Sequence, residues 1–196
     1  DSSSNDVTVI NGANNATTSV SVGATPVAVA VNLITNKIYV ANLNGNDVTV
    51  IDGASKGTRA VPGGRGSRAV ILYPVTNKAY VANRYSGDVT VIDGATNDTT
   101  TVPVGSYPSA VAVNPVTNRI YIANSNSNDV TVIDGPSNAT ITIPAGRIPY
   151  ALAVNPVTDK VYVVNRYSHD VTVIQGTGTA ATVAVGTSPC AVTVNP

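Results

Sequence analysis

The stretch NPVTNRIYIANSNSNDVTVIDG, residues 114–135, decides the fold, because versions of it recur along the whole chain. Its second half contains the string Asp-Val-Thr-Val-Ile. This string begins every 41 residues, at Asp6, Asp47, Asp88, Asp129 and Asp170. Its first half carries a tyrosine that recurs in register at Tyr39, Tyr80, Tyr121 and Tyr162. Self-similarity at a fixed period of this length is typical of repeat architectures such as propellers and solenoids.

Each 41-residue unit predicts four short β-strands, here called a to d from the centre of the molecule outwards. In the third unit they cover residues 110–114, 119–123, 129–133 and 140–145. The strands are rich in β-branched residues, and clusters of Asn, Asp, Gly and Pro separate them. Four strands in such a period indicate a propeller blade, and the missing 3.6-residue apolar period excludes an α-solenoid. We therefore predict an all-β fold, a β-propeller of 41-residue four-stranded blades.

One propeller domain is expected over residues 1–196. Its four complete blades are predicted at residues 27–63, 68–104, 109–145 and 150–185. A fifth blade is split between the termini and consists of residues 1–22 together with 190–196. The equivalent of residues 116–123, a whole strand b, is missing from that blade. Two alternatives remain: a five-bladed ring closed by the split blade, or a stretch of a longer ring.

Composition excludes several classes of function. The 11 Lys and Arg residues balance 11 acidic residues, so the net charge does not steer the chain to nucleic acid or to an anionic membrane. One Cys and one His exclude an internal disulfide and a conventional zinc site. No apolar run reaches the ~18 residues of a membrane span. Low charge and loops rich in Thr, Asn and Ser suggest an extracellular, cell-surface or periplasmic location.

The motifs KIYVAN (residues 37–42), NPVTNRIYIAN (114–124) and SNDVTVIDG (127–135) resemble the YVTN-type β-propeller repeat. That repeat occurs in archaeal surface-layer proteins and in many secreted bacterial proteins. The resemblance covers essentially the whole chain and implies a propeller that is secreted or located at the cell surface. For function it is less specific, because propellers serve as scaffolds, adhesins, lyases and redox enzymes alike.

Catalytic constellations are nearly absent from the sequence. A Ser-His-Asp arrangement would have to use His169 beside Asp170, and Asp170 occupies the repeated strand-c position. The Asp-Gly pairs after strand c are better explained as hairpin turns than as calcium ligands. Cys190 is expected to be a small buried apolar residue of an inner strand. The sequence therefore predicts no catalytic residues, no metal and no cofactor.

Residues that break the repeat are the candidates for binding. In a propeller, the d–a and b–c loops lie on one face, which here collects arginines and tyrosines and is called the Arg/Tyr face. Arg and Tyr are enriched at interfaces. The candidate binding residues are Arg65, Arg68, Arg84, Tyr85, Tyr107, Arg147, Arg166 and Tyr167. Tyr150 and His169 are expected on the same face.

The function that these observations favour is a secreted or cell-surface propeller that binds or scaffolds without catalysis of its own. Its expected partner is a protein or a surface polymer in a multi-subunit extracellular assembly, with no nucleic acid and no membrane span. The alternative is an enzyme domain, a lyase-like or redox propeller, with its site over the axis on the Arg/Tyr face. An enzyme should show polar groups converging in a pocket, whereas a scaffold should show a flat face.

Overall fold

The computed structural model describes residues 1–195, and all of its regular elements are β-strands. Each repeat forms one antiparallel sheet of four strands. Blade 1 consists of β3 (Pro26–Asn32), β4 (Lys37–Asn42), β5 (Asp47–Asp52) and β6 (Thr58–Pro62). Blade 2 consists of β7 (Ser67–Tyr73), β8 (Lys78–Asn83), β9 (Asp88–Asp93) and β10 (Thr99–Pro103). Blade 3 consists of β11 (Pro108–Asn114), β12 (Arg119–Asn124), β13 (Asp129–Asp134) and β14 (Thr140–Pro144). Blade 4 consists of β15 (Pro149–Asn155), β16 (Lys160–Asn165), β17 (Asp170–Gln175) and β18 (Thr179–Ala184).

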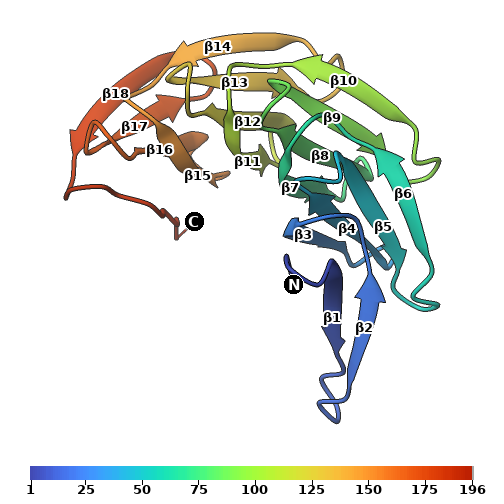
Figure 1. Cartoon of the computed structure of the whole chain (residues 1–196). Helices are drawn as coiled ribbons and strands as arrows, with labels where there is room; N and C mark the ends of the chain where they lie inside the picture. The colour runs from blue at the N-terminus through green and yellow to red at the C-terminus, as the bar shows by residue number, and fades with distance from the viewer. Residues whose placement is uncertain (196) are drawn as a thin grey trace.

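The four blades stand side by side in an open arc around a common centre (Figure 1). The strand-a elements β3, β7, β11 and β15 lie nearest to the centre, and the strand-d elements β6, β10, β14 and β18 form the outer rim. Neighbouring inner strands contact one another along the arc. This arrangement confirms the predicted all-β propeller fold.

The recurring tyrosine of strand b fills the space between successive blades. Tyr39 is fully buried and packs among Ala79, Val81 and Ile92 of the next blade. Tyr80 and Tyr121 take the same place in the next two interfaces, and both are fully buried. Burial of large apolar surface at each interface is the dominant force that holds neighbouring blades together.

The Asp-Val-Thr-Val-Ile motif has a second structural role, because its Asp and Thr accept hydrogen bonds from a buried asparagine. In blade 3, Asn124 Nδ2 donates to Asp129 Oδ1 at 2.7 Å and to Thr131 Oγ1 at 2.9 Å. The same pair of hydrogen bonds is made by Asn42, Asn83 and Asn165 in the other blades. This asparagine bridge ties the end of strand b to strand c in every blade. A buried amide NH₂ group without acceptors would be costly, which accounts for the three residue types recurring together.

The two ends of the described chain do not form a common sheet. β1 (Asp6–Ile10) and β2 (Thr17–Ser21) pair only with each other, and residues 190–195 lie outside the strands. The ends border the opening of the arc (Figure 1), so the fifth blade made of residues 1–22 and 190–196 stays a prediction. The expectation of a buried Cys190 is wrong, because its side chain is exposed where residues 190–195 join no sheet.

Within residues 1–195 there is no helix long and apolar enough to cross a membrane.

Candidate functional site

A pocket of about 240 Å³ opens on the Arg/Tyr face of blades 2 to 4. It is lined by Arg68, Arg84, Ser109, Ser125, Ile148, Tyr150, Arg166 and Tyr167. We call it the arginine pocket, since three of its eight lining residues are arginines.

Two positions of the repeat supply six of these side chains. The second residue of strand a is Arg68, Ser109 or Tyr150 in blades 2, 3 and 4. The residue that follows strand b is Arg84, Ser125 or Arg166 in the same blades. Because the repeat superimposes these positions on successive blades, the side chains converge on one pocket.

Backbone hydrogen bonds hold the residues after strand b in place. Arg84 N–H donates to Gly66 O at 2.8 Å, and Arg166 N–H donates to Ile148 O at 2.9 Å. Both acceptors belong to the d–a turn that enters the blade, at a residue with positive φ in each repeat. The backbone of both arginines is therefore held in place, although they lie in loops.

Aromatic rings orient two of the guanidinium groups. The Arg84 guanidinium carbon lies 5.4 Å from the centre of the Tyr107 ring, and Tyr85 meets Tyr107 edge-to-face with ring centres 6.0 Å apart. The Arg166 guanidinium carbon lies 5.2 Å from the centre of the Tyr150 ring. Cation–π contacts of this kind favour the charged head group over the ring face and restrict its rotation.

The arginine pocket is positively charged. None of its lining residues is acidic, and the ion pairs found among residues 1–195 lie elsewhere, at Asp1–Asp6 and Arg119–Asp159. Arg84 Nε is buried and has no hydrogen-bond partner among the described residues. Three guanidinium groups without carboxylate partners in one concave site create a field that attracts an anion. They also offer planar donor pairs that suit carboxylate or phosphate.

The two serines of the pocket are engaged with backbone carbonyls. Ser109 Oγ lies 2.9 Å from Pro149 O and 3.1 Å from Ala123 O, and Ser125 Oγ donates to Tyr107 O at 2.9 Å. Neither has the adjacent base that activates a nucleophilic serine. The pocket as described is therefore suited to binding an anion and to stabilising negative charge.

The structure gathers part of the predicted binding set. Four of the eight candidates line the pocket, namely Arg68, Arg84, Arg166 and Tyr167. Tyr85 and Tyr107 lie beside them through their contacts with Arg84 and with each other. Arg65 and Arg147 do not line the pocket, and their carbonyls accept the N–H groups of Tyr85 and Tyr167. That any of these residues binds a ligand stays a prediction.

Sequence reasoning missed Ser109, Ser125 and Ile148 and left Tyr150 out of the candidate set. A signal for Ser109 and Tyr150 was present, because the second residue of strand a is Val27, Arg68, Ser109 and Tyr150 in successive blades. A position that varies inside an otherwise regular repeat is released from blade packing. Comparing such positions between blades, rather than selecting residue types, would have found the pocket.

A model of the family described as "Lactonase, 7-bladed beta-propeller" matches residues 19–184. No curated protein matches the sequence significantly. Among solved structures, virginiamycin B lyase from Staphylococcus aureus is 11% identical with a TM-score of 0.80, covering 94% of this chain and 64% of that one. A putative 6-phosphogluconolactonase from Bacteroides uniformis is 13% identical with a TM-score of 0.71, covering 95% and 66%. Hydrazine synthase from Kuenenia stuttgartiensis is 21% identical with a TM-score of 0.68, covering 76% and 44%.

These likenesses to solved structures show the fold, and the chain spans less than two thirds of the length of each of the three proteins. The predicted resemblance is confirmed at the level of a β-propeller family, while the narrower relation to the YVTN-type repeat of surface-layer proteins stays a prediction. The expectation of a protein without enzyme activity is contradicted, because the matching family model is one of lactonases and two of the similar structures are a lyase and a putative lactonase. The Arg/Tyr face contains a charged pocket, whereas a flat face was expected of a scaffold.

Proposed function

Because the chain belongs to the seven-bladed β-propeller lactonase family, we propose that it is part of an enzyme that hydrolyses a lactone or related ester of a small anionic molecule. The observation that carries this proposal is the arginine pocket, in which Arg68, Arg84 and Arg166 converge without a carboxylate. The proposed substrate class is a phosphorylated sugar lactone, in line with the name of the similar putative 6-phosphogluconolactonase.

In the proposed reaction, water adds to the lactone carbonyl carbon and gives up a proton to the solvent, and the carbonyl oxygen becomes an oxyanion. The ring C–O bond then breaks, the released alkoxide takes up a proton, and a hydroxy acid results. This chain contributes binding of the anionic group and stabilisation of the oxyanion, since guanidinium donors preorganised at a developing negative charge lower the barrier. The contacts of Arg84 with Tyr107 and of Arg166 with Tyr150 supply that preorganisation.

Water is the proposed nucleophile rather than an enzyme serine. Ser109 and Ser125 are hydrogen-bonded to carbonyls, so their hydroxyl protons are not directed at a base. Tyr150 and Tyr167 line the same wall, where phenol groups can hydrogen-bond to substrate hydroxyls.

The test compares hydrolysis of phosphorylated and unphosphorylated gluconic acid δ-lactone, followed by acid release. We expect a higher kcat/KM for the phosphorylated lactone and a loss of roughly 10²–10³-fold in Arg84→Ala and Arg166→Ala if these groups hold the oxyanion. Lys78→Ala and Lys160→Ala, on the opposite face, are matched controls and should keep full activity. Circular dichroism checks that each variant is folded. Hydrolysis no faster than in buffer for both lactones would overturn the proposal.

A second candidate function is binding of a protein or surface polymer on the same face, in the manner of an assembly component. It is favoured by the exposure of Tyr85, Tyr107 and Tyr167, whose side chains are 50%, 41% and 57% accessible. Exposed tyrosines beside arginines are frequent energetic centres of interfaces. The test is competition between a phosphorylated sugar acid and the partner. If the sugar acid displaces the partner, both bind at the arginine pocket. If partner binding does not change, the two ligands use different sites.

We also propose an extracellular, cell-surface or periplasmic location, supported by the 11% content of charged residues and by the resemblance to surface-layer repeats. Fractionation of the source cells tests it, and recovery of the protein only from the cytoplasm would overturn it.

A further inference from the structure

A recurring hydrogen bond joins the b–c loop to the turn that leads to the next blade, except after blade 2, where Gly87 has no side chain to accept it. The acceptor is the side chain of the residue just before the strand-c aspartate. Asn5 Oδ1 accepts from Thr25 N at 2.8 Å, Asn46 Oδ1 from Gly66 N at 3.0 Å, and Asn128 Oδ1 from Ile148 N at 2.8 Å. We call this hydrogen bond the turn clasp, because it fixes the chain where it passes from one blade to the inner strand of the next.

In blade 4, a histidine takes the place of this asparagine. His169 Nδ1 accepts from Ser188 N at 2.9 Å, and the sequence separation is one residue shorter, as the deletion in the preceding loop requires. His169 has the same left-handed backbone as its counterparts, with φ of 58° against 56° for Asn5 and 59° for Asn128. Backbone hydrogen bonds from His169 N to Asn165 O and from Val185 N to His169 O complete the equivalent geometry. The imidazole therefore replaces the amide oxygen as the acceptor of the turn clasp.

The substitution changes how the clasp responds to protons. An amide oxygen accepts a hydrogen bond at any ordinary pH. An imidazole Nδ1 accepts only when the ring is neutral and carries its proton on Nε2, and in the imidazolium form both ring nitrogens are donors. Histidine is the side chain whose charge normally changes between pH 5 and 8. After protonation, the Nδ1–H of His169 would face the N–H of Ser188, and the hydrogen bond would be lost.

The charged groups around His169 are few. Its own loop carries three charged or titratable side chains, those of Arg166, Tyr167 and Asp170. Arg147 belongs to the turn hydrogen-bonded to that loop. Residues 185–189, on the other side of the clasp, carry no titratable side chain. Of the two sides of the clasp, only the His169 side therefore carries a group whose protonation removes the hydrogen-bond acceptor.

We propose that His169 is a pH-sensitive clasp between blade 4 and the segment after it, closed when the imidazole is neutral and open when the imidazole is protonated. The three asparagine clasps of the same molecule are insensitive to pH between about 5 and 8. The proposal rests on the hydrogen-bond geometry and is independent of the proposed enzyme activity.

Amide hydrogen exchange of the full ¹⁵N-labelled chain at pH 7.5 and pH 5.0 tests the clasp, with rates expressed as protection factors to remove the intrinsic effect of pH. We expect the protection of Ser188 to fall about tenfold or more at pH 5.0, as local opening predicts. Thr25, Gly66 and Ile148, held by asparagine clasps, should keep theirs and serve as internal controls. The matched variant is His169→Asn, which restores the residue of the repeat. Its Ser188 amide should be equally protected at both pH values.

Three results would overturn the proposal. These are an unprotected Ser188 amide at pH 7.5, protection that does not change with pH in the native chain, or the same loss of protection in His169→Asn. The ring ¹⁵N shifts of His169 give a second measurement that does not need a variant. At pH 7.5 they should report the neutral tautomer protonated at Nε2, and the other tautomer would contradict the clasp.

Discussion

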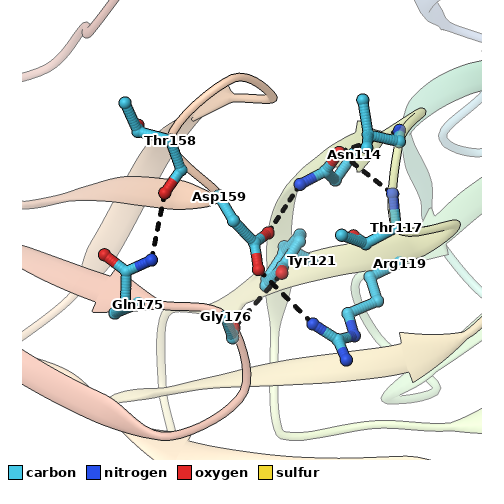
Figure 2. Close-up of polar contacts among 9 residues, drawn as sticks. Asn114, Thr117, Arg119, Tyr121, Thr158, Asp159, Gln175 and Gly176 are labelled. Atoms are coloured by element: carbon cyan, nitrogen blue, oxygen red, sulfur yellow. Dashed lines mark hydrogen bonds and ion pairs between the residues drawn. The ribbon is translucent and has the colours of Figure 1, made fainter.

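Arg119 Nη1 lies 3.6 Å from Asp159 Oδ2, so an ion pair joins blades 3 and 4 on the face opposite the arginine pocket (Figure 2). The other carboxylate oxygen of Asp159 accepts a 2.7 Å hydrogen bond from Asn114 Nδ2. The earlier repeats have asparagine at this position, and between blades 1 and 2 Asn32 Nδ2 donates to Asn77 Oδ1 at 3.0 Å. Between blades 3 and 4, a hydrogen bond from an amide to a carboxylate and an ion pair thus stand where blades 1 and 2 have a hydrogen bond between two neutral amides.

The hydrogen bond of Asp159 should matter more for stability than its ion pair. Both charged side chains are about one-third exposed, so Asp159→Asn should cost less than about 1 kcal/mol. Asp159→Ala should cost about 1–3 kcal/mol, because it leaves the amide of the fully buried Asn114 without its acceptor. Urea unfolding of the two variants measures the difference. Equal destabilisation by both would mean that the charge, and not the hydrogen bond, holds the interface.

The asparagine bridge predicts a loss of stability when its threonine becomes valine. Thr131 Oγ1 accepts from Asn124 Nδ2 at 2.9 Å and from Gly105 N at 3.3 Å. Thr131→Val keeps the shape of the side chain and removes the acceptor, so we expect a cost of about 1–3 kcal/mol in the free energy of unfolding. Thr101→Val, on the exposed outer strand β10, is the control and should stay within about 0.5 kcal/mol of the native chain. A Thr131→Val variant as stable as this control would show that the bridge is dispensable.

The blades could be predicted from sequence because their signals are repeated and local. The five copies of Asp-Val-Thr-Val-Ile fix strand c, and the tyrosine in register fixes strand b, so each blade is specified several times over. The segment after Ser188 could not be predicted in the same way. Residues 190–195 have the inner-strand pattern, but a strand needs a neighbour to pair with, and in the structure they form no sheet.

The arginine pocket was only partly predictable, because it depends on distances between blades that the sequence does not give. Arg84 and Arg166 stood out as exceptions to the repeat, and both line the pocket. Arg65 and Arg147 stood out equally, yet they lie outside its lining. The presence of arginine predicted the face of the propeller on which the pocket lies. The position of each arginine within the repeat decides whether its side chain lines the pocket.

The buried tyrosines predict a loss of stability in alkaline solution. Burial raises the pKa of Tyr80 to about 12, and the nearby Tyr73 and Asp134 contribute in the same direction. Because the unfolded chain ionises at an ordinary pKa of about 10, the stabilising effect is complete below pH 10 and is lost as the pH rises towards 12. The free energy of unfolding should therefore fall between pH 10 and 12, and less steeply in Tyr80→Phe. Chemical unfolding at a series of pH values measures both slopes.

The same tyrosines differ at neutral pH. Tyr80 Oη has no hydrogen-bond partner among the described residues, whereas Tyr121 Oη donates to Gly176 O at 3.2 Å. Tyr80→Phe should thus be neutral or slightly stabilising, and Tyr121→Phe should cost about 1 kcal/mol. The opposite order in unfolding experiments at pH 7 would contradict this assignment.

The left-handed backbone of Ile148 leads to a prediction that one substitution weakens ligand binding and hardly changes the free energy of unfolding. It lines the arginine pocket with φ of 54°, a left-handed conformation that a β-branched residue adopts only at a cost of roughly 1–2 kcal/mol. Glycine occupies the equivalent position in blade 2, at Gly66. In Ile148→Gly, relief of this strain offsets the greater flexibility of the unfolded chain, so the free energy of unfolding should change by less than about 1 kcal/mol.

Affinity should respond differently, because Ile148→Gly removes an apolar wall and loosens the carbonyl that holds Arg166 N–H. We expect a phosphorylated sugar acid, measured by calorimetric titration, to bind about tenfold more weakly, equivalent to about 1.4 kcal/mol. Thr25→Gly is the matched control: it has the same left-handed backbone and a β-branched side chain, but lies outside the pocket lining. It should cost slightly more stability, because Thr25 Oγ1 also accepts a hydrogen bond from Asn44 Nδ2, and it should leave the affinity unchanged. Equal affinities in the two variants would mean that Ile148 does not contribute to ligand binding in the pocket.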